Sequence, residues 1–207
     1  MHPNRKFQLT DRGEIARIVR EAGFGALVVQ TPEGLRAVHV PFLLEGDRLR
    51  FHVSRGNAFH ATLAAGCEAL LLVDGGHAYI SPDWYGLDDR VPTWSYVAVE
   101  LNGAVSPLGR DGLIALVDGL SDEHERRLLP KPVWSKEKMS PGRYDGLLKA
   151  IEGFELTVRD WRGTVKLDQD KPPEVRARLA TALRERGEEQ VAGLVFSSPR
   201  NRGEDKA

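Results

Sequence analysis

The chain has 207 residues, a length that fits one or two domains and allows a hydrophobic core large enough to fold without crosslinks. Hydrophobic residues make up 41% and charged residues 29% of the chain, which excludes a disordered or fibrous protein. The 29 Lys and Arg against 30 Asp and Glu give a net charge of −1, so the basic excess of a dedicated nucleic-acid binder is missing. Cys67 is the single cysteine, which excludes an intramolecular disulfide and a multi-cysteine zinc site.

The N-terminal part of the sequence predicts one helix and three strands. Apolar side chains recur at helical spacing in residues 10–22, where we expect a short amphipathic helix. In the strand-like runs that follow, His39 and His52 fall on the face opposite to the apolar side chains. These runs predict hairpin-connected strands at 25–31, 35–44 and 48–54.

The middle of the sequence predicts a short helix and a second hairpin. We expect the helix over 57–65, with Asn57 as its N-cap and Gly66 as its stop. The hairpin is expected over 68–81, with its turn at the Asp-Gly-Gly sequence of 74–76.

The rest of the sequence predicts two longer strands and several helices. A strand over 94–103 is expected to end at its Asn-Gly pair. The other expected elements are helices at 111–127 and 143–151, a strand at 153–160, and helices over 172–195 that break near Gly187.

Short strands joined by hairpins, without long crossover helices between them, predict a closed antiparallel barrel with helices at its ends rather than an α/β sheet. We divide the chain into a barrel domain (1–165), a C-terminal motif with helices packed on the barrel (166–199) and a flexible tail (200–207). The N-terminal residues lack the pattern of a signal peptide, and the apolar runs are too short to span a bilayer. We therefore expect a cytoplasmic protein that makes no contact with a membrane.

Common catalytic and metal-binding motifs are missing from the sequence. It contains no phosphate-binding P-loop, no dinucleotide fingerprint after a strand, no nucleophile elbow and no zinc-protease motif. The six histidines show no spacing typical of a metal site on a helix. We assign no catalytic residue and no metal ligand.

The run HVSRGN at 52–57 places a polar loop between a strand and a helix. Backbone N–H groups at a helix start, the Arg55 guanidinium and the Ser54 hydroxyl together favour a phosphate-binding cradle. The alternative is an ordinary turn in which Asn57 caps the helix and Arg55 points into water.

Two later segments suggest the rest of a ligand site. Residues 77–96 contain five Trp and Tyr residues, whose rings suit a planar heterocycle or, alternatively, a core or dimer contact. In 163–171, Lys166 and Gln169 suit an anion or an amide edge, unless this segment is merely an exposed turn. A phosphate cradle, a ring platform and hydrogen-bonding edges together describe a site for flavin mononucleotide (FMN).

Six short motifs occur in the order seen in the PaiB family of FMN-binding negative transcriptional regulators, which the chain resembles from about residue 1 to 172. The most specific pair is AYISPDWY at 78–85 with VPTWSY at 91–96. The others are HVPF at 39–42, HVSRGN at 52–57, IEGFEL at 151–156 and KLDQ at 166–169. The chain departs from the family's usual PTWNY and KLSQN at Ser95, Asp168 and Asp170.

The resemblance implies an antiparallel, Greek-key split β-barrel with a C-terminal helical appendage, which forms a homodimer with FMN at the subunit interface. It implies that residues near the phosphate and ribityl chain are His52, Ser54, Arg55 and Asn57. It further implies that Ser81, Thr93 and Trp94 lie along the flavin, that Lys166 and Gln169 close the site, and that His39 and Trp84 line it.

Several functions remain open at this point. The resemblance favours a regulator for which FMN is the signal, although the sequence has no helix-turn-helix and no basic stripe, which disfavours direct DNA binding. The alternatives are an FMN-dependent oxidoreductase or flavin reductase on the same barrel, a haem-binding split barrel, and a plain interaction dimer without flavin.

Overall fold

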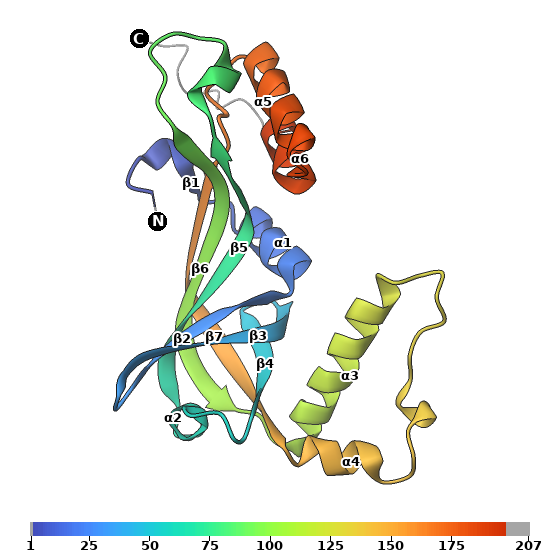
Figure 1. The fold of residues 1–207 in the computed structure, drawn as a ribbon. Coiled ribbons are helices and arrows are strands. Elements are labelled where there is room, and N and C mark those ends of the chain that lie inside the picture. The colour runs from blue at the N-terminus through green and yellow to red at the C-terminus, as the bar shows by residue number, and fades with distance from the viewer. Residues whose placement is uncertain (1, 198–207) are drawn as a thin grey trace. The chain divides into compact units, whose positions relative to one another are not determined.

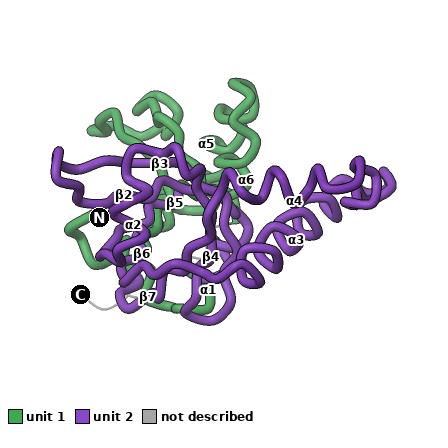
Figure 2. Tube along the Cα trace, turned by 90° about the horizontal axis from the view of Figure 1, so that it is seen from below, with its two compact units in different colours: residues 1–15, 74–99, 162–207 green, residues 16–73, 100–161 purple. Residues whose placement is uncertain are grey.

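The computed structural model describes residues 2–197 of the chain (Figure 1). It forms two compact units, coloured separately in Figure 2: unit 1 comprises residues 1–15, 74–99 and 162–207, and unit 2 comprises residues 16–73 and 100–161. The predicted division into 1–165 and 166–199 stays a prediction. The predicted tail, 200–207, lies outside the described residues.

The predicted hairpins of the N-terminal half are confirmed in unit 2. Strand β2 (Phe24–Thr31) pairs antiparallel with β3 (Gly34–Glu45), and β3 pairs with β4 (Arg48–Ser54). Strand β5 (Cys67–Ile80) then returns to the free edge of β2, again antiparallel. The resulting strand order β5-β2-β3-β4 is that of a Greek key.

Two long strands close the sheet into a ring. Strand β6 (Thr93–Pro107) follows β5 in the sheet, and β7 (Ile151–Lys166) pairs with β4, with β6 and with the short β1 (Gln8–Leu9). The fold class predicted from the sequence, an antiparallel Greek-key split β-barrel with C-terminal helices, is confirmed.

The alternation of the strands separates the core of unit 2 from its outer face. Phe51 lies opposite Phe154 across β4 and β7, and both rings are fully buried, with centroids 5.8 Å apart. Burial of each such ring contributes roughly 1.5–3 kcal/mol to stability. His39 is exposed and His52 half-buried on the opposite face, as the alternation predicts.

The predicted hairpin over 68–81 is wrong, because β5 runs through these residues without a turn. Val73 and Ala78 are both buried, so the alternation slips by one residue between them, as in a β-bulge. Gly76 takes a φ of 112°, which favours glycine, and its N–H donates to Oδ1 of Asp74 over 2.8 Å. The Asp-Gly-Gly sequence therefore makes an irregularity inside a strand rather than its end.

The predicted strand ends near residues 103 and 160 are also wrong. Strand β6 continues to Pro107 and β7 to Lys166. A Cβ atom at Gly103 would lie 2.0 Å from the carbonyl oxygen of Thr157 in β7. Glycine at this position permits the close approach of two strands instead of terminating one.

The α-helices of the described residues lie where the sequence predicts them, except near residue 57. Gly187, with a φ of 79°, separates the last two helices as predicted. Of the residues described, none belongs to a helix long and apolar enough to cross a membrane. The helices are α1 (Arg12–Ala22), α2 (His60–Ala64), α3 (Arg110–Arg126), α4 (Arg143–Leu148), α5 (Pro173–Glu185) and α6 (Glu189–Ser197), with short 3-10 helices η1 (Arg5–Phe7), η2 (Pro82–Tyr85) and η3 (Lys136–Lys138).

Candidate functional site

The residues that the sequence predicts for the site fall into two sets, one in each unit. Unit 1 holds Ser81, Trp84, Thr93, Trp94, Lys166 and Gln169, and unit 2 holds His39, His52, Ser54, Arg55 and Asn57.

Thr93, Trp94 and Lys166 meet in unit 1 and form what we call the Lys166 cluster. Lys166, the last residue of β7, donates from Nζ to Oγ1 of Thr93 and, over 2.7 Å, to the carbonyl oxygen of Trp94. Its side chain is half-buried, and in the part of the chain that the structure describes no carboxylate pairs with it. Burial lowers the pKa of Lys166 and outweighs the opposing influence of nearby aspartates.

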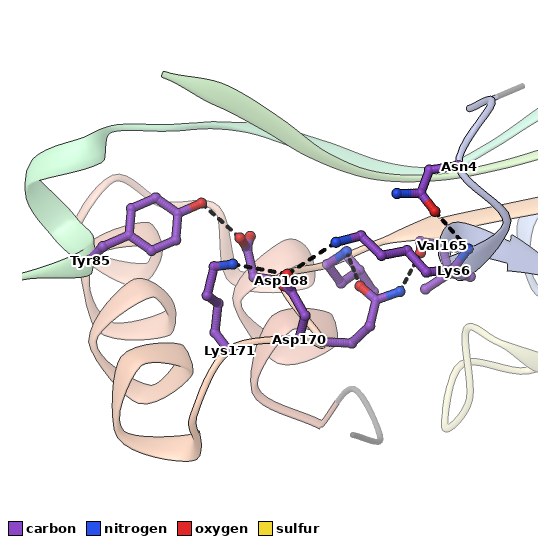
Figure 3. A network of polar contacts seen from close by, with 9 residues as sticks. Asn4, Lys6, Tyr85, Val165, Asp168, Asp170 and Lys171 are labelled. Carbon is purple, nitrogen blue, oxygen red and sulfur yellow. Dashed lines mark hydrogen bonds and ion pairs between the residues drawn. The ribbon is translucent and has the colours of Figure 1, made fainter. Parts of the chain in front are cut away.

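Asp168 organises the turn that follows β7. Its Oδ1 accepts a hydrogen bond of 2.7 Å from the Tyr85 hydroxyl (Figure 3), and its Oδ2 accepts one of equal length from the Ser95 hydroxyl. Burial, followed by these contacts with Asp168, raises the pKa of Tyr85. Both carboxylate oxygens of Asp168 are thus engaged by neutral hydroxyls.

Asp170 carries the second negative charge of this turn. Its Oδ2 accepts from Lys6 over 3.2 Å and from Lys171 over 3.0 Å (Figure 3). Burial disfavours its charged form, but the bonds from Lys171 and Lys6 prevail and lower the pKa of Asp170. A cavity of about 250 Å³ opens among Lys6, Tyr85, Thr93, Lys166, Asp168 and Asp170.

Gln169 is buried and uses both ends of its amide within the same turn. Its Oε1 accepts from the N–H of Leu167 over 2.9 Å, and its Nε2 donates to the carbonyl of Val165 over 2.7 Å. In this structure Gln169 shapes the turn that presents Lys166. Ser81 and Trp84 belong to the η2 region and are not among the residues that line the 250 Å³ cavity.

Trp94 also forms one wall of a larger cavity, of about 630 Å³, in unit 1. Trp94 is 52% exposed, and its ring lies 5.7 Å from the ring of His77 and 6.3 Å from that of Tyr79, measured between centroids. Residues 186–188, which join α5 to α6, and the first three residues of α6 line the same cavity. This aromatic cavity is large enough for a planar tricyclic ring, and Trp94 connects it to the Lys166 cluster.

In unit 2 the predicted helix start at Asn57 is wrong, because α2 begins at His60 and has five residues. The chain forms a polar turn first: Oδ1 of Asn57 accepts from the N–H of Phe59 over 3.2 Å, and Oγ of Ser54 accepts from that of Gly56 over 3.2 Å. Ser and Asn side chains compete in this way with helix formation. The backbone donors that the sequence predicted for a phosphate are therefore bonded within the protein.

Arg55 keeps its donors at the surface of this turn. Its Nη1 lies 2.7 Å from Oε2 of Glu152, and Nε2 of His60 lies 2.6 Å from the same oxygen. The sequence analysis missed Glu152 and His60, since nothing in the spacing connects them to Arg55. The remaining guanidinium N–H groups and the Ser54 hydroxyl are the donor types that suit a phosphate.

The two predicted histidines have different surroundings. His39 is exposed and stacks on Phe24 with centroids 5.9 Å apart. His52 lines a mainly apolar cavity of about 310 Å³ together with Trp134 and side chains of α3. Among the residues that the structure describes, Nδ1 of His52 is buried without a hydrogen-bond partner, and burial lowers the pKa of this residue.

Comparisons with known proteins agree with this architecture. The chain is 32% identical over 175 residues, 83% of either protein, to "Protease synthase and sporulation protein PAI 2" of Bacillus subtilis (strain 168). Among solved structures it is similar in fold to a FAD and heme binding protein from Mycobacterium smegmatis, with a TM-score of 0.57 and 18% identity over 77% of this chain and 73% of that one. It is also similar to conserved hypothetical protein Rv2991 from Mycobacterium tuberculosis, with a TM-score of 0.58 and 13% identity over 83% and 94% of the two chains.

The family comparison covers most of the chain. Residues 1–160 match the model of the family described as "Putative FMN-binding domain", and the resemblance to PaiB proteins is confirmed by this match and by the Bacillus subtilis relative. The chain therefore belongs to the family of the "Putative FMN-binding domain".

Proposed function

We propose that this protein binds FMN and that the Lys166 cluster holds part of the ligand. The observation that carries the proposal is the Lys166 ammonium group, which is half-buried and bonded to two neutral oxygens, of Thr93 and Trp94. A cation in such a place is stabilised by a ligand that brings negative or partly negative oxygen atoms. FMN has such oxygens in its phosphate and in the carbonyl groups of its ring.

The aromatic cavity supports the choice of a flavin over a simple anion. Trp94 presents its ring to this cavity and its carbonyl group to Lys166, so a ligand with a flat ring and an electronegative edge suits both features. The family description supports FMN, and a fold neighbour whose name includes FAD binding shows that a related fold accepts a flavin.

When bound, FMN supplies electron and hydride transfer, and this chain supplies binding and orientation. Trp94 packs against the ring, while Lys166 and Thr93 face its electronegative edge. Separately, Arg55 and Ser54 of the polar turn after β4 carry donors of the type that suits a phosphate. Asp168 acts indirectly, because it fixes the turn from which Lys166 projects.

The proposal includes a homodimer with FMN at the subunit interface. The hairpin of β2 and β3 exposes Phe24 at 53% and Leu35 at 67% of their surface, and Leu72 of β5 is exposed beside β2. Exposed apolar side chains on adjoining strands favour an association surface. The molar mass from light scattering tests this part, because a strictly monomeric FMN-loaded protein contradicts it.

A regulatory role in the cytoplasm, with FMN as the signal, completes the proposal and rests on the resemblance to PaiB proteins. Direct contact with DNA is not part of it, because the net charge is −1 and the sequence lacks a basic stripe. Gel-shift measurements at physiological salt test this point, and sequence-specific retardation would contradict it.

Titration of the flavin-free protein with FMN tests the central claim. We expect quenching of FMN fluorescence, a change in its visible absorption bands and saturation at one FMN per chain. A sample that leaves the FMN spectrum and fluorescence unchanged at high protein concentration refutes the proposal.

A further inference from the structure

The turn that carries Arg55 lies beside the start of β7. Ser54 pairs with Ile151, Val53 pairs with Glu152, and the N–H of Arg55 donates to the carbonyl of Ala150 over 2.9 Å. These backbone contacts fix the distance between the two segments. They place the side chain of Glu152 within reach of Arg55 without any contribution from a ligand.

Glu152 makes two contacts that differ in exposure to solvent: the contact with His60 is largely buried, and the contact with Arg55 is at the surface. Its Oε2 lies 2.6 Å from Nε2 of His60, and the side chains of Glu152 and His60 are both 19% exposed. The same oxygen lies 2.7 Å from Nη1 of Arg55, whose side chain is 52% exposed. The Arg55 contact joins one oxygen to one nitrogen, so it lacks the two parallel hydrogen bonds of the strong arginine–carboxylate geometry.

We propose that Glu152 is a built-in competitor for phosphate at Arg55 and thereby sets how tightly the site holds a dianionic phosphomonoester. This inference rests on the proposed FMN function. A phosphomonoester presents three oxygens, so it can occupy the planar fork of Arg55 at two points and displace a carboxylate held at one. Glu152 keeps its bond to His60 when this happens.

The competition affects charged and neutral ligands differently. A neutral ligand such as riboflavin has nothing to exchange for the Glu152 carboxylate and gains nothing from Arg55. A dianion gains binding free energy from the full guanidinium contact. It loses part of this free energy because it must displace the Glu152 carboxylate from Arg55 and because the two negative groups repel each other. Removal of the Glu152 charge therefore strengthens binding of FMN and leaves binding of riboflavin unchanged.

The Glu152→Gln variant tests this directly, because glutamine keeps the shape of the side chain and an oxygen that accepts from His60. We expect the affinity for FMN to rise about ten-fold and the affinity for riboflavin to stay within about two-fold. Glu155→Gln is the matched control on the same strand, since Glu155 pairs with Arg50 over 3.0 Å, and we expect wild-type affinities for it. Unchanged or weaker FMN binding by Glu152→Gln overturns the inference.

A double variant shows whether Glu152 acts through Arg55. With Arg55→Ala in the background, we expect Glu152→Gln to leave FMN affinity unchanged, because the shared partner is gone. A ten-fold gain that persists without Arg55 means that Glu152 acts at a distance, which overturns the competition. Thermal unfolding of all variants identifies any that fail to fold.

Inorganic phosphate separates this inference from the proposed function. NMR signals of the backbone amides of residues 54–57, followed during a phosphate titration, report the anion at Arg55 independently of flavin. If wild-type protein does not bind FMN, the proposed function fails, and the phosphate titration still decides the role of Glu152. Tighter phosphate binding in Glu152→Gln than in wild type supports the competition, and equal or weaker binding overturns it.

Discussion

The hydroxyl of Ser95 donates a 2.7 Å hydrogen bond to Oδ2 of Asp168, and these two residues stand at positions where the chain departs from the usual PaiB pattern. In that pattern asparagine replaces Ser95 and serine replaces Asp168. Each departure alone alters a polar contact at the site, but together they form a matched donor and acceptor. The hydroxyls of Ser95 and Tyr85 thus bind both oxygens of the Asp168 carboxylate within the protein, and its negative charge is directed away from a ligand.

Replacement of Asp168 by alanine is expected to lower the free energy of unfolding by about 1–3 kcal/mol, because the hydroxyls of the buried residues Tyr85 and Ser95 lose their acceptor. Asp168 has a φ of 56°, a conformation that alanine disfavours and asparagine tolerates, so Asp168→Asn should cost less. Urea unfolding measures both variants. The exposed Asp88→Ala is the control, and an equal loss for it would contradict this explanation.

Lys166→Met is expected to weaken FMN binding by about ten- to a hundred-fold, the effect of a lost charge-assisted hydrogen bond. Lys171→Met should weaken binding much less, because Lys171 lines the same cavity but pairs with Asp170 over 3.0 Å. Fluorescence titration with FMN measures both. Equal losses for the two lysines would show that only the total positive charge of the cavity matters.

Trp94→Ala should lower the free energy of unfolding by only about 1 kcal/mol, less than the loss of a fully buried aromatic residue, since 52% of the residue's surface is exposed. Binding of FMN should nevertheless become weaker, and Trp94→Phe should restore most of it because phenylalanine keeps a flat ring. A stability loss without a change in FMN affinity would assign Trp94 to packing alone.

Stability should fall as the solution is acidified through the ordinary histidine pKa of 6.5, in part because of His52. Burial lowers the pKa of His52 in the folded protein, so the unfolded chain binds the proton first and acidification favours unfolding. Urea unfolding at pH values above and below this range should show a smaller loss for His52→Asn than for wild type. Identical pH profiles for the two proteins would contradict the prediction.

Gly103→Ala should destabilise the protein by about 3 kcal/mol or more, because the new Cβ would lie 2.0 Å from a backbone oxygen of Thr157. Gly109→Ala is the control, since a Cβ at Gly109 meets no atom of the described part of the chain within 4 Å. Thermal unfolding compares the two variants. Wild-type stability of Gly103→Ala would show that the two strands can separate without cost.

The sequence predicted most of the fold because local patterns determine most of it. The alternation in residues 35–54 gave the correct inner face of two strands, and Gly187 marked the break between the last helices. The Asp-Gly-Gly sequence at 74–76 misled because the same residues that favour a tight turn also favour a bulge, and only pairing with distant strands distinguishes the two.

The candidate site was less accessible to sequence reasoning. The motifs led to Thr93, Trp94 and Lys166, which the structure brings into contact. The sequence did not indicate the contacts around these residues. Lys6 binds Asp170, which lies 164 positions away in the sequence, and His60 binds Glu152, which lies 92 positions away. No local pattern encodes such pairs, because each is created by the sheet that joins their segments.

The four boundaries between the two units fall inside α1, β5, β6 and β7 rather than in loops. A single cleavage of the backbone therefore releases neither unit intact, and every excision would split regular elements. Neither half can be expected to survive as a free fragment or to be transplanted by gene fusion.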